Sequence, residues 1–240
     1  MLRWMLRGTV CFTLAAGVAC AQAPSRLLDV SKALQDASRG KEVMAQLAQF
    51  PFGECQTVEY HVAMAKAARN ANVPARAAEA FGIVNLLPAQ VTPSAIGMVG
   101  TELPVLRSWL TAKSEELYKK AVAAKAAGDM KTAVKSYLVA VKCDASVMSR
   151  DDSGLGSLGL NALKKLAAAH PEKVDLQFQL AYYDYLFGDS RGAIAALESH
   201  QKSQTDVYKK WRAGIWLATI KAGEAGPAPR QGGAIAATGL

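Results

Sequence analysis

Residues 115–143 read EELYKKAVAAKAAGDMKTAVKSYLVAVKC, and their spacing predicts two helices joined by a tight turn at Gly128-Asp129. Apolar and small residues recur every three or four positions in both halves, so each predicted helix has one apolar face. These faces consist of Leu117, Ala121 and Ala124 in the first helix and of Ala133, Tyr137, Ala140 and Val141 in the second. Because neither helix can bury its apolar face alone, the stretch predicts a helical hairpin.

The same stretch resembles a tetratricopeptide repeat (TPR), in which small residues lie where two antiparallel helices touch, a glycine forms the turn, and an aromatic residue follows a small one by four positions. The matching positions are Ala121, Gly128, Asp129, Ala133, Tyr137 and Ala140. The resemblance implies an all-α fold, an α-solenoid of TPR-like hairpins, in which the first helix of each hairpin lines an inner groove.

Two other stretches repeat this pattern more weakly. They are residues 59–88, with a turn at Asn72-Val73-Pro74 and a step from Ala77 to Phe81, and residues 174–202, with a turn at Gly188-Asp189 followed by Ala193. Gly128 lies 56 residues after Asn72, and Gly188 lies 60 residues after Gly128. Tandem repeats of this family recur about every 34 residues, so we expect an irregular solenoid with extra helices between the hairpins.

The remaining segments predict a leader, a cap and a tail around this array. Residues 1–21 are the predicted signal peptide, 25–55 two N-terminal capping helices, 56–221 the TPR-like array, and 222–240 a flexible tail rich in Gly, Ala and Pro. Within the array, the spacing predicts helices over 158–169 and 206–221, and a loop or short helix over 90–101. A helix from Leu103 to Gly128 is also expected if Pro104 does not interrupt it.

The first residues have the layout of a secretory signal peptide. Arg3 and Arg7 precede an apolar run over 8–18, which small residues follow. We expect cleavage after Ala21, with Ala23 as the alternative. Residues 17–20 also resemble a lipoprotein box, in which Cys20 would carry a lipid. The expected location is the bacterial periplasm or the exterior, or the outer membrane if Cys20 is lipidated.

Removal of the leader would leave Cys55 and Cys143. Either the two form a disulfide in an oxidising compartment, or Cys143 packs as a small apolar residue at a helix end. The formal charge of +8 arises without a run of Arg or Lys, which disfavours nucleic acid as a partner.

The sequence contains no complete signature of an enzyme or a metal site. His61, His170 and His200 lie far apart and lack partners at metal-ligand spacing. Glycines 154, 156 and 159 match the letters of a dinucleotide fingerprint, but no predicted strand precedes them. Asp151 and Asp152 are expected to cap a helix. We therefore expect neither a cofactor nor catalysis, and an enzyme with a carboxylate or tyrosine site in the groove is the least favoured alternative.

The resemblance places candidate partner-binding residues on the groove-lining helix of each hairpin. They are Lys66 and Arg69 in the first hairpin, Glu115, Tyr118 and Lys125 in the central one, and Phe178, Tyr182 and Tyr185 in the last. Tyrosine suits recognition because its ring buries a large area with few rotatable bonds, while its hydroxyl keeps a hydrogen bond. The alternative is that Phe178 and the two tyrosines pack against the following helix.

The expected function is therefore that of an exported, non-enzymatic scaffold or adaptor, which binds a protein or peptide of the cell envelope through its groove. The alternative is a structural subunit of an envelope complex that associates with itself and that a lipid on Cys20 would tether to the membrane.

Overall fold

The structure, a computed structural model, describes residues 23–87, 93–151 and 154–225, and these residues contain helices and turns but no β-strand. The predicted all-α class is therefore confirmed. The predicted signal peptide, Cys20, Asp152 and the chain beyond residue 225 lie outside the described residues.

Ten α-helices and three short 3-10 helices make up the described part of the chain. In order they are α1 (Ala23–Ala33), η1 (Ala37–Arg39), α2 (Gly40–Leu47), η2 (Glu54–Gln56), α3 (Val58–Asn70), α4 (Pro74–Leu86), α5 (Pro93–Ala126), α6 (Met130–Cys143), η3 (Ala145–Arg150), α7 (Leu155–Ala169), α8 (Val174–Leu186), α9 (Ser190–Ser203) and α10 (Val207–Ala225).

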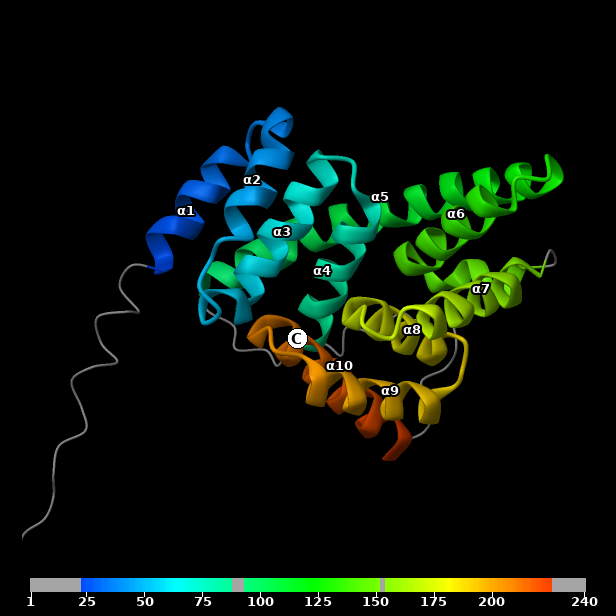
Figure 1. Cartoon of the computed structure of the whole chain (residues 1–240). Helices are drawn as coiled ribbons and strands as arrows, with labels where there is room; N and C mark the ends of the chain where they lie inside the picture. Colours follow the sequence, from blue (N-terminus) through cyan, green and yellow to red (C-terminus); the bar gives the residue numbers. More distant parts are fainter. Residues whose placement is uncertain (1–22, 88–92, 152–153, 226–240) are drawn as a thin grey trace, which may run out of the picture.

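The three predicted hairpins are present as α3 with α4, α5 with α6, and α8 with α9 (Figure 1). Their turns share one backbone conformation. Asn72, Gly128 and Gly188 each have a positive φ, of 55°, 79° and 92°. The N–H of the residue after each of them bonds to the carbonyl five positions earlier, as from Asp129 to Ala124 at 2.9 Å, which is the Schellman motif that ends a helix.

The second helices of the central and last hairpins begin with an aspartate cap. Asp129 accepts a hydrogen bond from the backbone N–H of Thr132 at 3.0 Å, and Asp189 accepts one from that of Gly192 at 2.8 Å. In the first hairpin Pro74 occupies the opening helical position, where a missing N–H costs nothing. The turn chemistry of each hairpin is therefore encoded within a few residues.

Helix α5 differs from the expectation for residues 90–101, because residues 93–101 belong to one helix of 34 residues rather than to a loop or a short helix. Pro104 lies inside it without ending it. Pro104 and Gly100 are both exposed. Water can therefore reach the Gly100 carbonyl, which loses its N–H partner to the proline ring.

Small residues let the helices approach closely. Ala133 and Tyr137, on which the predicted central hairpin depends, are both completely buried.

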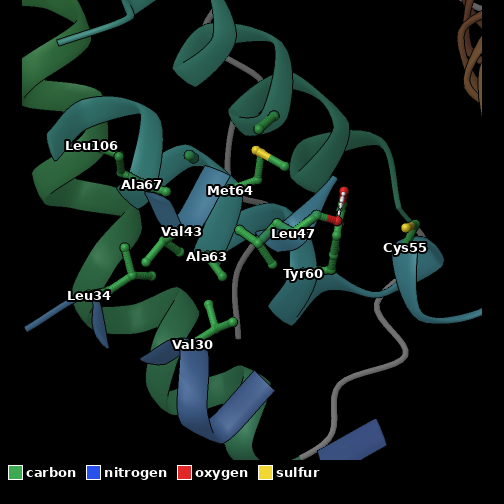
Figure 2. Close-up of a cluster of buried hydrophobic side chains, with 12 residues drawn as sticks. Val30, Leu34, Val43, Leu47, Cys55, Tyr60, Ala63, Met64, Ala67 and Leu106 are labelled. Atoms are coloured by element: carbon green, nitrogen blue, oxygen red, sulfur yellow. Dashed lines mark hydrogen bonds between the residues drawn. The ribbon is translucent and has the colours of Figure 1, made fainter. Parts of the chain in front are cut away.

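In the N-terminal part, α1 and α2 pack on α3, and Val43 and Leu47 point into the core that Figure 2 shows. The hydroxyl of buried Tyr60 donates to the Leu47 carbonyl at 3.2 Å, which satisfies the polar end of that ring.

The path of the chain turns back on itself after α6. The first two hairpins stack directly, with α3 on α5 and α4 on α6, and then α7 packs on α6 and α8 packs on α7. The last helix, α10, packs on α9 and also on α4 (Figure 1). Sequential antiparallel packing is thus present, but the end of the array returns to its second hairpin.

Cys55 and Cys143, the two cysteines among the described residues, are free and pack against different clusters. Cys55 belongs to the cluster around Tyr60, whereas Cys143, the last residue of α6, packs with Ala77 and Leu110. Burial raises the pKa of both thiols, that of Cys143 to about 12. Both side chains therefore remain protonated thiols that pack as small apolar groups.

Substitution of Gly128 tests the turn of the central hairpin. Gly128→Ala should destabilise the protein by about 1 kcal/mol, because a left-handed backbone costs an L-residue that much, while a Cβ there would meet no neighbouring atom. Gly53 is the matched control, since its Cβ would also meet nothing and its φ is −60°. Urea unfolding should show a loss for Gly128→Ala only, and equal stabilities of the two variants would contradict this account of the turn.

Candidate functional site

Helix α10 covers the part of the array where a groove was expected. Trp211 lies parallel to the ring of His61 from α3, at 5.8 Å between ring centroids and 14° between planes, and Tyr208 stacks on the same imidazole at 6.3 Å. Phe52 meets the Trp211 ring edge-on. These contacts join the last helix of the described chain to its N-terminal third.

The three predicted aromatic groove residues also face this helix. Tyr182 and Tyr185 contact the edge of Trp216 at 5.0 and 6.4 Å. Phe178 is only 5% exposed and packs both on His200 of the following helix and under the guanidinium of Arg212, which lies 4.1 Å from its ring centroid. The proposed aromatic binding face is therefore occupied by α10 of the same chain.

The predicted residues of the central hairpin form a separate group around Arg150 of η3. The Arg150 guanidinium bonds to the Glu115 carboxylate at 2.6 Å and lies 5.3 Å from the centre of the Tyr118 ring. The Tyr118 hydroxyl donates to the Arg150 carbonyl at 2.6 Å. Val122, one turn further along α5, is 40% exposed, and Lys125 is partly buried. The side chains of Glu115 and Arg150 are 42% and 47% exposed, whereas Tyr118 is partly buried and its ring centroid lies 6.3 Å from that of Tyr137.

The predicted basic residues of the first hairpin contribute less. Lys66 forms an ion pair with Glu102 of α5, and both side chains are 23% exposed. Arg69, on the same helix, is partly buried. Of the eight candidates, Glu115 and Tyr118 contact Arg150, Tyr182 and Tyr185 contact Trp216, and Lys66 contacts Glu102, so these contacts belong to separate groups.

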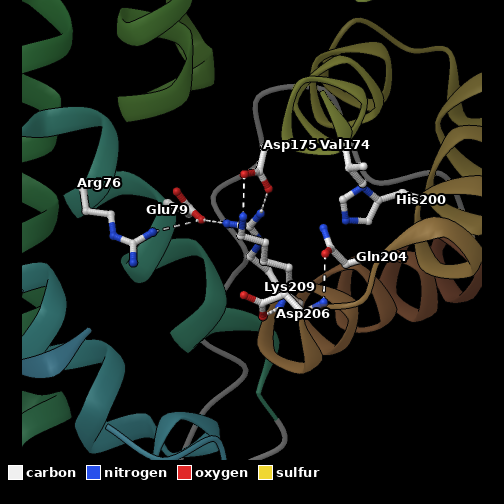
Figure 3. A network of polar contacts seen from close by, with 9 residues as sticks. Arg76, Glu79, Val174, Asp175, His200, Gln204, Asp206 and Lys209 are labelled. Atoms are coloured by element: carbon white, nitrogen blue, oxygen red, sulfur yellow. Dashed lines mark hydrogen bonds and ion pairs between the residues drawn. The ribbon is translucent and has the colours of Figure 1, made fainter. Parts of the chain in front are cut away.

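A polar network that sequence reasoning missed joins α4, α8 and α10 (Figure 3). Glu79 of α4 accepts a hydrogen bond from Arg212 of α10 and lies 3.4 Å from the guanidinium of Arg76. Arg212 also lies 3.9 Å from the Asp175 carboxylate, which Lys209 contacts at 2.6 Å. Glu79 and Arg212 are 15% and 9% exposed, so this pair is largely withdrawn from water.

Lys142 of α6 extends the network. Its ammonium lies 5.6 Å from the centre of the Tyr182 ring, and burial lowers its pKa although Glu79 favours the charged form. Burial alone would raise the pKa of Glu79, but the positive charges of Arg212, Lys142 and Arg76 lower it overall. Glu79 is therefore a buried carboxylate held in its charged form by surrounding cations.

The described part of the chain has no group of three or more His, Cys, Asp or Glu side chains placed to hold a metal ion. Across residues 23–87, 93–151 and 154–225, none of the helices combines the length and apolar character that crossing a bilayer requires.

Comparisons with known proteins give no match: the chain fits no family model, and no curated protein or solved structure is similar to it.

Acid should weaken the contact between α3 and α10 through His61, which is 1% exposed. Burial lowers the pKa of His61 from 6.5 to about 4, although the Cys55 carbonyl opposes the shift. The unfolded chain therefore takes up a proton first as the pH falls, so the free energy of unfolding should decrease between pH 6.5 and about 4 and change no further through this group below that range. The loss amounts to about 3 kcal/mol.

His61→Phe should remove this component of the pH dependence, because phenylalanine keeps the stacked ring without a titrating group. His170→Gln is the control, since the side chain of His170 is 39% exposed. Denaturant unfolding across this pH range measures the effect. An acid sensitivity of His61→Phe equal to that of the wild type would show that another group is responsible.

Proposed function

We propose that the protein is an exported, non-enzymatic scaffold or adaptor with TPR-like helical hairpins, and that it binds a protein or peptide of the cell envelope. The hairpin turn that recurs at residues 72, 128 and 188 supports the fold. Each of these residues has a positive φ and donates its N–H to the carbonyl three positions earlier, and the N–H of the next residue bonds to the carbonyl five positions earlier. The support for export is the arrangement of Arg3, Arg7 and the apolar run after them.

The proposed binding role rests on Tyr118 and its neighbours Glu115, Val122 and Arg150, here called the Tyr118 group. The Tyr118 ring is held by its hydrogen bond to the Arg150 carbonyl and by the guanidinium beside it. An aromatic side chain that is already immobilised loses little entropy on binding, and exposed Val122 continues its apolar surface along α5. Glu115 and Arg150 supply charges at the rim, which favour selectivity over affinity.

The packing of α10 supports the kind of partner proposed. At the aromatic end of the array, Tyr182 and Tyr185 receive the Trp216 side chain of a helix. Phe178 receives the guanidinium of Arg212, one turn before Trp216. Surfaces of this array thus accept an aromatic, basic helix in cis, and a helical or extended peptide segment is the expected partner in trans.

A structural, self-associating subunit is the second candidate, and α7 provides the observation that favours it. Leu158 and Leu166 are 42% and 48% exposed and lie eight residues apart, on the same face of that helix. A second copy of the chain would cover these side chains if two α7 helices packed together.

Two pairs of substitutions separate the candidates. Wild type, Tyr118→Ala with Val122→Asp, and Leu158→Asp with Leu166→Asp are each used as bait for proteins of the host envelope, and light scattering gives the mass of each purified protein. The proposed function predicts that the Tyr118 pair loses a captured protein that the Leu158 pair retains, and that calorimetry with this purified protein shows at least tenfold weaker binding.

Circular dichroism must show that both variants keep the helical content of the wild type. Equal capture by all three baits would refute the proposed surface. A wild-type dimer that the Leu158 pair converts to a monomer would favour the structural subunit instead.

A further inference from the structure

The network around Glu79 contains more positive than negative charge. The cationic side chains are Arg76, Lys142, Lys209 and Arg212, and the carboxylates are Glu79 and Asp175. Lys209 and Asp175 form their own pair at 2.6 Å. The remaining three cations, here called the cationic cluster (Arg76, Lys142 and Arg212), share the single carboxylate of Glu79, which leaves a net charge of +2.

Burial makes this excess costly. Arg212 is 7% exposed as a whole residue. Its Nε atom is inaccessible to water and has no hydrogen-bond acceptor within the described residues. Lys142 has no carboxylate within ion-pair distance in the same part of the chain, and its pKa is lowered mainly by burial. The rings of Tyr182 and Phe178 lie against Lys142 and Arg212, but a cation–π contact offsets only about 2 kcal/mol of the several that a buried charge without a counter-ion costs, so a bound anion would stabilise the cluster.

The polar network reaches the surface through its outer members. The side chains of Arg76 and Lys209 are 35% and 36% exposed, and that of Asp175 is 55% exposed. Asp175 and Lys209 also line an open groove of about 710 Å³ between the start of α8 and the loop before α10. Glu172 and Lys173 line the same groove, and Asp175 connects it to Arg212, whose guanidinium lies 3.9 Å from the Asp175 carboxylate.

We propose that the cationic cluster is a binding site for a compact divalent oxyanion of the phosphate or sulfate class. Two guanidinium groups offer paired N–H donors, which match the edges of a tetrahedral oxyanion, and the Lys142 ammonium adds a point charge. Two negative charges balance the net +2. The site lies on α4, α6 and α10, so it is independent of the Tyr118 surface and extends beyond the proposed partner binding.

The test measures thermal unfolding of the full chain at near-neutral pH with increasing sodium sulfate or sodium phosphate, against sodium chloride at the same ionic strength. The proposal predicts a saturable rise in Tm with the divalent anions, of roughly 4 °C once the anion reaches about ten times its Kd. General salt stabilisation by sulfate rises without saturation and is shared by all variants. Isothermal titration calorimetry with sulfate alone should give one site per chain.

Lys142→Met separates an anion site from a purely structural lysine. If the cluster lacks an anion, this variant should unfold at a higher Tm than the wild type in chloride, because one uncompensated charge is gone, and it should lose the saturable response. Lys135→Met is the matched control, since Lys135 is exposed two turns earlier on α6 and should leave both quantities unchanged.

Arg76→Gln provides a second variant in which a partly exposed side chain is changed, and it should weaken sulfate binding at least tenfold. The proposal is overturned if wild type shows no saturable response to either divalent anion. A response of Lys142→Met equal to that of the wild type would overturn it as well.

Discussion

The contact between Arg212 and Glu79 joins α10 to α4 across 133 positions of sequence, and the closed form of the array depends on it. A buried ion pair of this kind adds little net stability, because desolvation of both charges offsets their attraction. The ion pair instead determines where α10 lies along α4. The favourable free energy comes from the apolar surface that Trp211 and Trp216 bury on either side of Arg212.

Closure divides the groove expected from the sequence into two parts with different roles. At one end, Phe178, Tyr182 and Tyr185 serve as the receiving surface for the chain's own last helix. On the central hairpin, Tyr118 and Arg150 hold each other in place on the surface. The sequence features that suggested recognition are the same for all of these aromatic residues, and packing on α9 and α10 withdraws Phe178, Tyr182 and Tyr185 from a partner.

The hairpins could be predicted from the sequence because everything that defines them is local. A glycine or asparagine that tolerates a positive φ, an aspartate that caps the next helix, and alanines at helical spacing all lie within about 30 residues of one another, and the structure confirms all three turns. The order of small and aromatic residues also located Ala133 and Tyr137 in the core. Local propensity and periodicity suffice for this level of structure.

Contacts between distant segments could not be predicted in this way. Glu79 and Arg212 are ordinary surface-type residues in sequence, and nothing periodic links them. Gly40 is buried where α2 meets the end of α3, and a Cβ there would lie 2.6 Å from the Ala71 nitrogen, a close approach that no local pattern indicates. Helix α10 is packed on two sides, on α9 and on α4, so the spacing of a single apolar face does not identify Trp216 as a contact residue.

A double-mutant cycle between Glu79→Gln and Arg212→Met tests directly whether α10 docks on α4. The two residues can influence each other's contribution to stability only if the helices are in contact, so the free energies of unfolding should show a coupling of about 1–3 kcal/mol. Effects that add within about 0.5 kcal/mol would mean that the two side chains do not meet, and the closed array described here would then be wrong.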